Sequence, residues 1–173
     1  DGPHTRAVSS VVRLGGDRAI LVIGQAASAR MEDSLPWEDL ATCDAAFFTG
    51  HDPATLMAGR RARTLVVTSR RLAQLIESGV RADVLTASDA DVSERVDPGE
   101  LPVAPGAIVW TEGGEGGRYR RADGTTGRWS AAPLPGDPVD SYGCGDSFAA
   151  GLTVGLARGL DLGDALALGA RCG

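Results

Sequence analysis

Short apolar runs alternating with helical stretches constrain the fold of this chain more than any other feature. The apolar runs lie at residues 45–49, 64–68, 83–86 and 107–111. Helices are expected between them, around residues 54–62, 71–78 and 90–96. Strands that are apolar on both faces are typical of parallel sheets with helices on both sides. We therefore predict an α/β fold with a mostly parallel central sheet.

Different patterns precede and follow this alternation. Residues 7–13 and 18–23 are β-rich runs separated by Leu-Gly-Gly-Asp, which predicts a hairpin with a glycine turn. After residue 111, the segments 117–122 and 127–132 predict a β-meander, and two helices are expected from about residues 145 and 162. We interpret the whole as one α/β unit preceded by a small hairpin.

Composition excludes several classes of function. The formal net charge is −6, and an acidic surface disfavours nucleic acid as a partner. The three cysteines, Cys43, Cys144 and Cys172, are odd in number and widely spaced, which fits neither a disulfide framework nor a zinc site. We expect a reducing, cytoplasmic environment. No apolar run approaches the roughly 18 residues of a membrane span, so no membrane partner is expected.

The two ends of the sequence suggest a segment of a longer protein. The first residue is Asp1 rather than Met, and the last helical pattern, over residues 162–172, stops without a turn or tail. We expect an internal piece that lacks an N-terminal region and the extreme C-terminus.

Residues 140–151 carry the clearest chemical signal. Asp140 and Asp146 lie on either side of a glycine-containing turn at residues 143–145, and an apolar helix follows. Small residues let the backbone turn successive N–H groups toward one point, and the helix adds the positive end of its dipole. A phosphate would fit there, with Asp146 close enough to accept a proton from an attacking hydroxyl. The pattern therefore favours phosphoryl transfer.

This stretch, D-S-Y-G-C-G-D-S-F-A-A-G, resembles the signature D-T-x-G-A-G-D-x-F-x-x-G of the ribokinase-like (PfkB) carbohydrate kinases. Ser141 replaces Thr and Cys144 replaces Ala, and both keep a small side chain. The segment after residue 108, V-W-T-E-G-G-E-G-G, resembles the family's strand followed by T-x-G-x-x-G. Strand-like segments at 47–50 and 65–68 and the entry to the hairpin also resemble the family, so the resemblance covers nearly the whole chain.

The resemblance implies roles for individual residues. Asp146 would be the catalytic base that deprotonates the sugar hydroxyl. The backbone anion hole would be formed by Gly143, Cys144 and Gly145. The nucleotide phosphates and ribose would be lined by Thr111, Gly113 and Gly116. The implied cofactors are ATP and Mg²⁺.

Two carboxylates are implied as ion sites. The family's N-x-x-E motif, which is associated with magnesium, aligns best with residues 88–91, where Ser88 replaces Asn and Asp91 replaces Glu. Asp91 is one methylene shorter than Glu and would act on Mg²⁺ through water. Asp140 would help to bind a monovalent cation such as K⁺, as its equivalent does in cation-activated members of the family. From the residues alone, a solvated or helix-capping acid is the favoured interpretation of Asp91.

The resemblance implies a ribokinase-like three-layer sandwich, with residues 1–24 forming a lid hairpin and residues 25–173 an α/β nucleotide-binding catalytic core. We expect ATP-dependent phosphorylation of a hydroxyl on a sugar or related small alcohol. A nucleoside kinase and a non-catalytic sugar- or nucleotide-binding relative are the alternatives. A homodimer is one oligomeric state that the resemblance allows.

The arginines at positions 70 and 71 form a charged cluster at a predicted helix start, and we expect them on a solvent-exposed face of that helix.

Overall fold

The computed structural model describes residues 8–14, 17–23, 27–134, 136 and 142–173. A six-stranded sheet forms its centre, in the order β3-β4-β5-β6-β7-β8. The first four strands run parallel, and β7 and β8 are antiparallel to their neighbours. The strands are β3 (Ala45–Phe48), β4 (Thr64–Thr68), β5 (Val84–Ser88), β6 (Ala107–Thr111), β7 (Gly117–Arg121) and β8 (Thr126–Trp129). The predicted parallel sheet and meander are confirmed.

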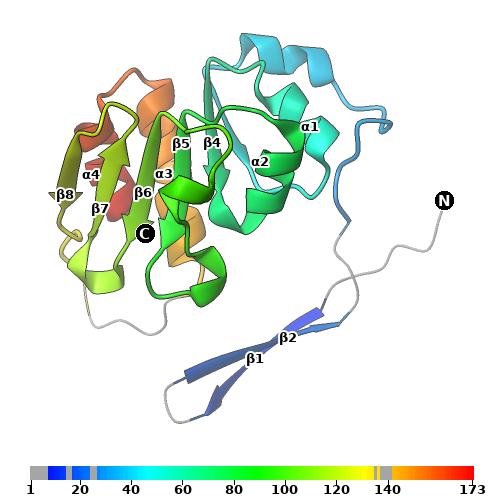
Figure 1. Ribbon diagram of the computed structural model, residues 1–173. Helices are drawn as coiled ribbons and strands as arrows, with labels where there is room; N and C mark the ends of the chain where they lie inside the picture. Colours follow the sequence, from blue (N-terminus) through cyan, green and yellow to red (C-terminus); the bar gives the residue numbers. More distant parts are fainter. Residues whose placement is uncertain (1–7, 15–16, 24–26, 135, 137–141) are drawn as a thin grey trace.

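Helices cover both faces of this sheet (Figure 1). On one face lie α1 (Pro53–Gly59) and α2 (Leu72–Ser78), which contribute Leu56 and Leu75 to a shared apolar cluster. On the other lie α3 (Cys144–Ala157) and α4 (Leu162–Cys172), which contribute Phe148, Leu152 and Leu166 to a second cluster. The three-layer α/β sandwich expected from the sequence is therefore confirmed.

Burial on both faces explains why the central strands are uniformly apolar. In β4, Leu65 and Val67 belong to the cluster under α1 and α2, whereas Val66 between them belongs to the cluster under α3 and α4. All three side chains are fully buried. Successive residues of a strand point to opposite faces, so a strand between two helical layers needs apolar residues at every position.

The N-terminal hairpin forms a sheet of its own. Strands β1 (Val8–Leu14) and β2 (Asp17–Ile23) pair antiparallel, with Val8 opposite Ile23 and Leu14 opposite Asp17. In Figure 1 the hairpin, in blue, stands apart from the sandwich. The expected hairpin is confirmed, while the domain boundary at residue 24 stays a prediction.

One expected helix is wrong. Residues 90–96 form only a short 3₁₀ turn, Val92–Glu94, followed by a second one, Pro98–Glu100. The Asp91 carboxylate caps the first turn by accepting the Ser93 N–H at 2.9 Å, and the backbone is extended again at Arg95. Val92 is 71% exposed, whereas Val96 is buried in the core. The single buried apolar anchor leaves no amphipathic face to sustain a longer helix.

None of the helices in the described part of the chain is long and apolar enough to cross a membrane.

Helix α3 should depend on its buried leucine. Leu152 is completely buried in the cluster between α3 and the sheet. Leu152→Ala should lower the free energy of unfolding by about 2–5 kcal/mol, because it leaves a cavity as well as losing apolar burial. Chemical denaturation measures this change. Leu134, which is 65% exposed, supplies the matched control: Leu134→Ala should change stability by less than about 0.5 kcal/mol. Equal effects of the two substitutions would contradict the packing described here.

Candidate active site

A pocket of about 300 Å³ lies where the carboxyl ends of the parallel strands meet the N-terminus of α3. Its lining includes Thr68 and Thr111, the last residues of β4 and β6. Gly143, Gly145 and Asp146 line it from the start of α3. Ligands in open α/β sheets bind outside the carboxyl ends of the strands, so this is the edge at which a site is expected.

The start of α3 presents backbone donors to this pocket. Gly143 is the N-cap residue, with a φ of 82°, and no side chain among the described residues caps the helix there. The first hydrogen bond of the helix runs from the Ser147 N–H to the Gly143 carbonyl at 2.8 Å. The N–H groups of the three residues between them have no partner within the helix. Such N–H groups and the helix dipole suit an anion, and a positive φ at residue 143 favours glycine.

Asp146 lies in the first turn of α3 and is exposed to the pocket. Its side chain therefore belongs to the same helix turn as the N–H groups of residues 144–146, which have no partner within the helix. An anion held by these groups and a hydroxyl held by the carboxylate would be neighbours. This is the spatial requirement for a base that serves an attack on a bound phosphate.

Arg70 also lines the pocket, and the sequence analysis missed this role. Its side chain is 60% exposed, in line with the expected solvated position, but it is held toward the site. The Arg70 Nε donates to the Glu94 carboxylate at 2.6 Å, and a terminal nitrogen lies 3.4 Å from Asp91 Oδ2. The position directly after the carboxyl end of β4 was the signal that could have revealed it.

The electrostatic balance at Arg70 is favourable to its charged form. The hydrogen bond to Glu94 raises the pKa of Arg70, and the nearby charges of Glu94, Asp91 and Asp146 add to this effect against the opposing effect of burial. Arg70 therefore stays a cation at the pocket, within the electrostatic range of Asp146. A phosphate group in the pocket would lie near both this cation and the turn of α3.

The residues expected to contact the nucleotide lie at the end of β6. Thr111 lines the pocket, and its hydroxyl donates to the Ala87 carbonyl at 3.3 Å. Gly113 and Gly116 lie in the short turn that follows, with φ angles of 60° and 91°. A Cβ at Gly116 would lie 2.2 Å from the Trp129 carbonyl oxygen, so only glycine fits. Neither glycine lines the 300 Å³ pocket itself.

Asp91 does not line this pocket either. Its Oδ1 accepts hydrogen bonds from the Ser93 N–H and hydroxyl, at 2.9 and 2.6 Å, and its Oδ2 faces Arg70. The hydrogen bond from the Ser93 hydroxyl is the main cause that lowers the pKa of Asp91. Among the described residues there is no cluster of three or more His, Cys, Asp or Glu side chains that could hold a metal ion. Asp140 lies outside the described residues.

The comparison with protein families matches residues 87–173, half of the chain, to the pfkB family of carbohydrate kinases. The chain belongs to this family. The matched region contains β6, the turn that follows it and the start of α3, and so most of the pocket. The resemblance stated from the motifs is confirmed.

Solved structures show the same fold at low sequence identity. Adenosine kinase from Schistosoma mansoni, in complex with 2-fluoroadenosine, is 13% identical with a TM-score of 0.76, covering 99% of this chain and 62% of its own. Ribokinase from Thermotoga maritima is 15% identical with a TM-score of 0.71, covering 94% and 60%. A PfkB protein from a Polaromonas species is 18% identical with a TM-score of 0.66, covering 99% and 67%.

The chain therefore spans about two thirds or less of the length of these proteins, 60% to 67% in the three cases. No curated protein matches the sequence.

The left-handed conformation at residue 143 can be tested with two matched substitutions. A Cβ would meet nothing within 4 Å at either Gly143 or Gly145, but only Gly143 has a positive φ. Gly143→Ala should therefore destabilise the protein by about 1–2 kcal/mol through backbone strain, whereas Gly145→Ala should cause no loss. Thermal unfolding measures both. A Gly143→Ala variant as stable as the parent would show that the turn does not adopt this conformation.

Proposed function

We propose that this chain is the nucleotide-binding and catalytic part of a kinase that transfers a phosphoryl group from ATP to a hydroxyl of a sugar or nucleoside. The observation that carries the proposal is the position of Asp146. It lies in the pocket at the first turn of α3, where the N–H groups have no partner within the helix, in a chain of the pfkB family. A general base beside an anion-binding turn is the arrangement that phosphoryl transfer to an alcohol requires.

Asp146 acts as the base in this proposal. The acceptor hydroxyl must lose its proton as it attacks the phosphorus, and an exposed carboxylate within reach of that hydroxyl can take it. The first turn of α3 fixes the backbone of Asp146 relative to the pocket. The position of Asp146 in the pocket and the membership of the chain in the pfkB family support this proposed role.

The backbone of residues 143–145 and the side chain of Arg70 bind and stabilise the transferring phosphoryl group. Charge on this group is spread over its equatorial oxygens, so positioned donors and a nearby cation supply most of the catalysis. Backbone N–H groups serve this purpose whatever the side chain at position 144 is. Thr111, at the end of β6, lies on the nucleotide side of the pocket, and Gly113 and Gly116 let the chain turn beside it.

ATP and Mg²⁺ are the proposed cofactors. Asp91 and Glu94 supply the carboxylates nearest to Arg70, and the Asp91 side chain is 43% exposed. Ser93 donates two hydrogen bonds to Asp91 Oδ1, and Oδ2 lies 3.4 Å from Arg70. A contact through a metal-bound water therefore suits Asp91 better than direct ligation of the metal. When bound, Mg²⁺ would neutralise charge on the phosphates of ATP. Asp140 keeps its proposed role toward a monovalent cation.

The acceptor class stays broad in this proposal. The structural neighbours include both a ribokinase and adenosine kinases, whose names refer to different acceptors. A sugar and a nucleoside both carry the hydroxyl that Asp146 would deprotonate. We propose a cytoplasmic protein, in line with its free cysteines at positions 43, 144 and 172. Its proposed partners are a small-molecule substrate and ATP, without nucleic acid. A homodimer is one oligomeric state to test.

Substitution of Asp146 tests the proposal. Asp146→Asn should lower the turnover of the full-length protein on the order of 10²–10⁴-fold, because the base is lost while the anion-binding turn is kept. ADP release with ATP, Mg²⁺ and a panel of sugars and nucleosides measures turnover, and calorimetric titration with ATP should show nearly unchanged binding.

Asp164→Asn is the matched control, because Asp164 also lies in the first turn of a helix, α4, and is exposed. It should keep the parental turnover. If Asp146→Asn turned over like the parent, Asp146 would not be the base. Tight ATP binding with no ADP release from the parent, across the whole panel, would favour the non-catalytic relative.

A further inference from the structure

An acidic side chain, Glu94, lines the pocket in which we propose that a phosphate binds. It belongs to the 3₁₀ turn Val92–Glu94 after β5, and its side chain is only 16% exposed. A carboxylate beside a phosphate would by itself weaken phosphate binding, because like charges repel each other. A glutamate at this place is therefore unexpected unless it acts through another group.

Arg70 is the group that Glu94 contacts. The Arg70 Nε donates to Glu94 Oε1 at 2.6 Å, whereas its Nη2 lies 3.4 Å from Asp91 Oδ2. The contact to Asp91, whose other oxygen accepts from Ser93, is the longer of the two and constrains Arg70 less. The Nε contact uses one of the five N–H donors of a guanidinium and sets the direction of the side chain. Donors on the terminal nitrogens stay available to a ligand.

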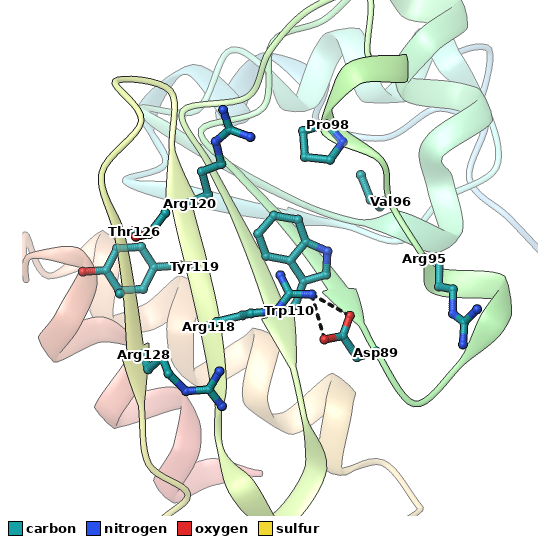
Figure 2. Close-up of a pocket in the computed structure, with 11 residues that line it drawn as sticks. Asp89, Arg95, Val96, Pro98, Trp110, Arg118, Tyr119, Arg120, Thr126 and Arg128 are labelled. Carbon is teal, nitrogen blue, oxygen red and sulfur yellow. Dashed lines mark hydrogen bonds and ion pairs between the residues drawn. The ribbon is translucent and has the colours of Figure 1, made fainter.

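The loop that carries Glu94 is itself held at both ends. At its start, the Asp89 N–H donates to the Thr111 carbonyl at 3.0 Å, and both Asp89 carboxylate oxygens accept from Arg118 at 2.9 and 2.8 Å. Beyond Glu94, Val96 is buried in the core. Figure 2 shows both anchors, the Arg118–Asp89 contact and the Val96 side chain. Glu94 thus lies on a backbone that is fixed on either side, as a residue that orients another side chain requires.

Arg70 has a second acid toward which it could turn. Among the described residues that line the pocket, the acidic ones are Glu94 and Asp146, and Asp146 lies within electrostatic range of Arg70. An Arg70–Asp146 pair would take the cation away from the phosphate and cover the carboxylate of the proposed base. The hydrogen bond to Glu94 at 2.6 Å opposes this pairing.

We infer that Glu94 is a positioning residue of this site, which holds Arg70 toward the terminal phosphate of ATP and away from Asp146. The inference rests on the proposed function and deepens it. It also predicts the sign of an effect: removal of Glu94 should weaken the binding of an anion. Without positioning, the loss of a negative charge from an anion site would strengthen that binding.

Calorimetric titration of the full-length protein without magnesium tests this inference, with ADP and a non-hydrolysable ATP analogue as separate probes. Glu94→Ala should weaken binding of the ATP analogue about five- to tenfold, because Arg70 loses its orientation toward the terminal phosphate. Binding of ADP, which lacks that phosphate, should stay nearly unchanged. These readouts do not depend on kinase activity.

Two conservative variants separate reach from charge. Glu94→Gln removes the charge but keeps an oxygen that accepts the Arg70 Nε–H, so it should keep most of the affinity for the ATP analogue. Glu94→Asp keeps the charge but is one methylene shorter, so it should weaken binding in the same direction as Glu94→Ala. It also keeps the test available if Glu94→Ala does not fold.

A double variant and a matched control separate positioning from a structural role. Arg70→Ser should weaken binding of the ATP analogue, and the addition of Glu94→Ala should cause no further loss, because Glu94 acts through Arg70. Asp83 pairs with Arg60 at the same distance of 2.6 Å, but it precedes β5 and so lies at the opposite end of that strand from the pocket. Asp83→Ala should lower stability and leave binding of the analogue unchanged.

The outcomes distinguish this inference from the proposed function. If Arg70→Ser bound the analogue more weakly but Glu94→Ala and Glu94→Asp bound it as tightly as the parent or more tightly, the inference would be wrong and the proposed function would stand. A further loss of binding on adding Glu94→Ala to Arg70→Ser would also overturn the inference alone. A parent protein that bound neither ADP nor the ATP analogue would overturn the proposed function, and the inference with it.

Discussion

The packing of α3 against the sheet is the contact on which the rest of the site depends. Phe148 and Leu152 bury one side of the helix in the core, and the Phe148 ring stacks on Trp129 of β8 with a centroid distance of 5.6 Å. This apolar contact sets where the helix begins relative to the strands. This contact positions Gly143 and Asp146 at the strand ends, because both residues precede the buried Phe148 by less than two helical turns.

The two faces of the sheet carry groups of different character. On the α3 face, backbone donors and a carboxylate meet a single cation, Arg70, which its acidic neighbours hold in place. On the other face, Arg118 of β7 stacks over Trp110 and pairs with Asp89. Because alternate residues of one strand face opposite ways, a shift of β6 would affect both faces.

The sequence predicted those elements whose signal is local. The strands of the parallel sheet are mostly apolar because both faces are covered by helices. The glycine turn before α3 is formed by residues that are adjacent in the sequence, so its pattern can be recognised there. The helix expected at 90–96 failed because Asp91 caps a single turn and only Val96 is drawn into the core. Arg70 was missed as a pocket residue because the orientation of its side chain depends on a hydrogen bond to Glu94, which is 24 positions away. The stacking of Arg118 over Trp110 depends on strand register, which single-sequence patterns do not specify.

A crystal structure of the full-length protein with a non-hydrolysable ATP analogue and magnesium tests the central claim most directly. The account predicts that the terminal phosphate lies within hydrogen-bonding distance of the backbone N–H groups at residues 143–145, with Asp146 and Arg70 on either side of it. A terminal phosphate bound elsewhere, with the start of α3 facing only solvent, would contradict the account.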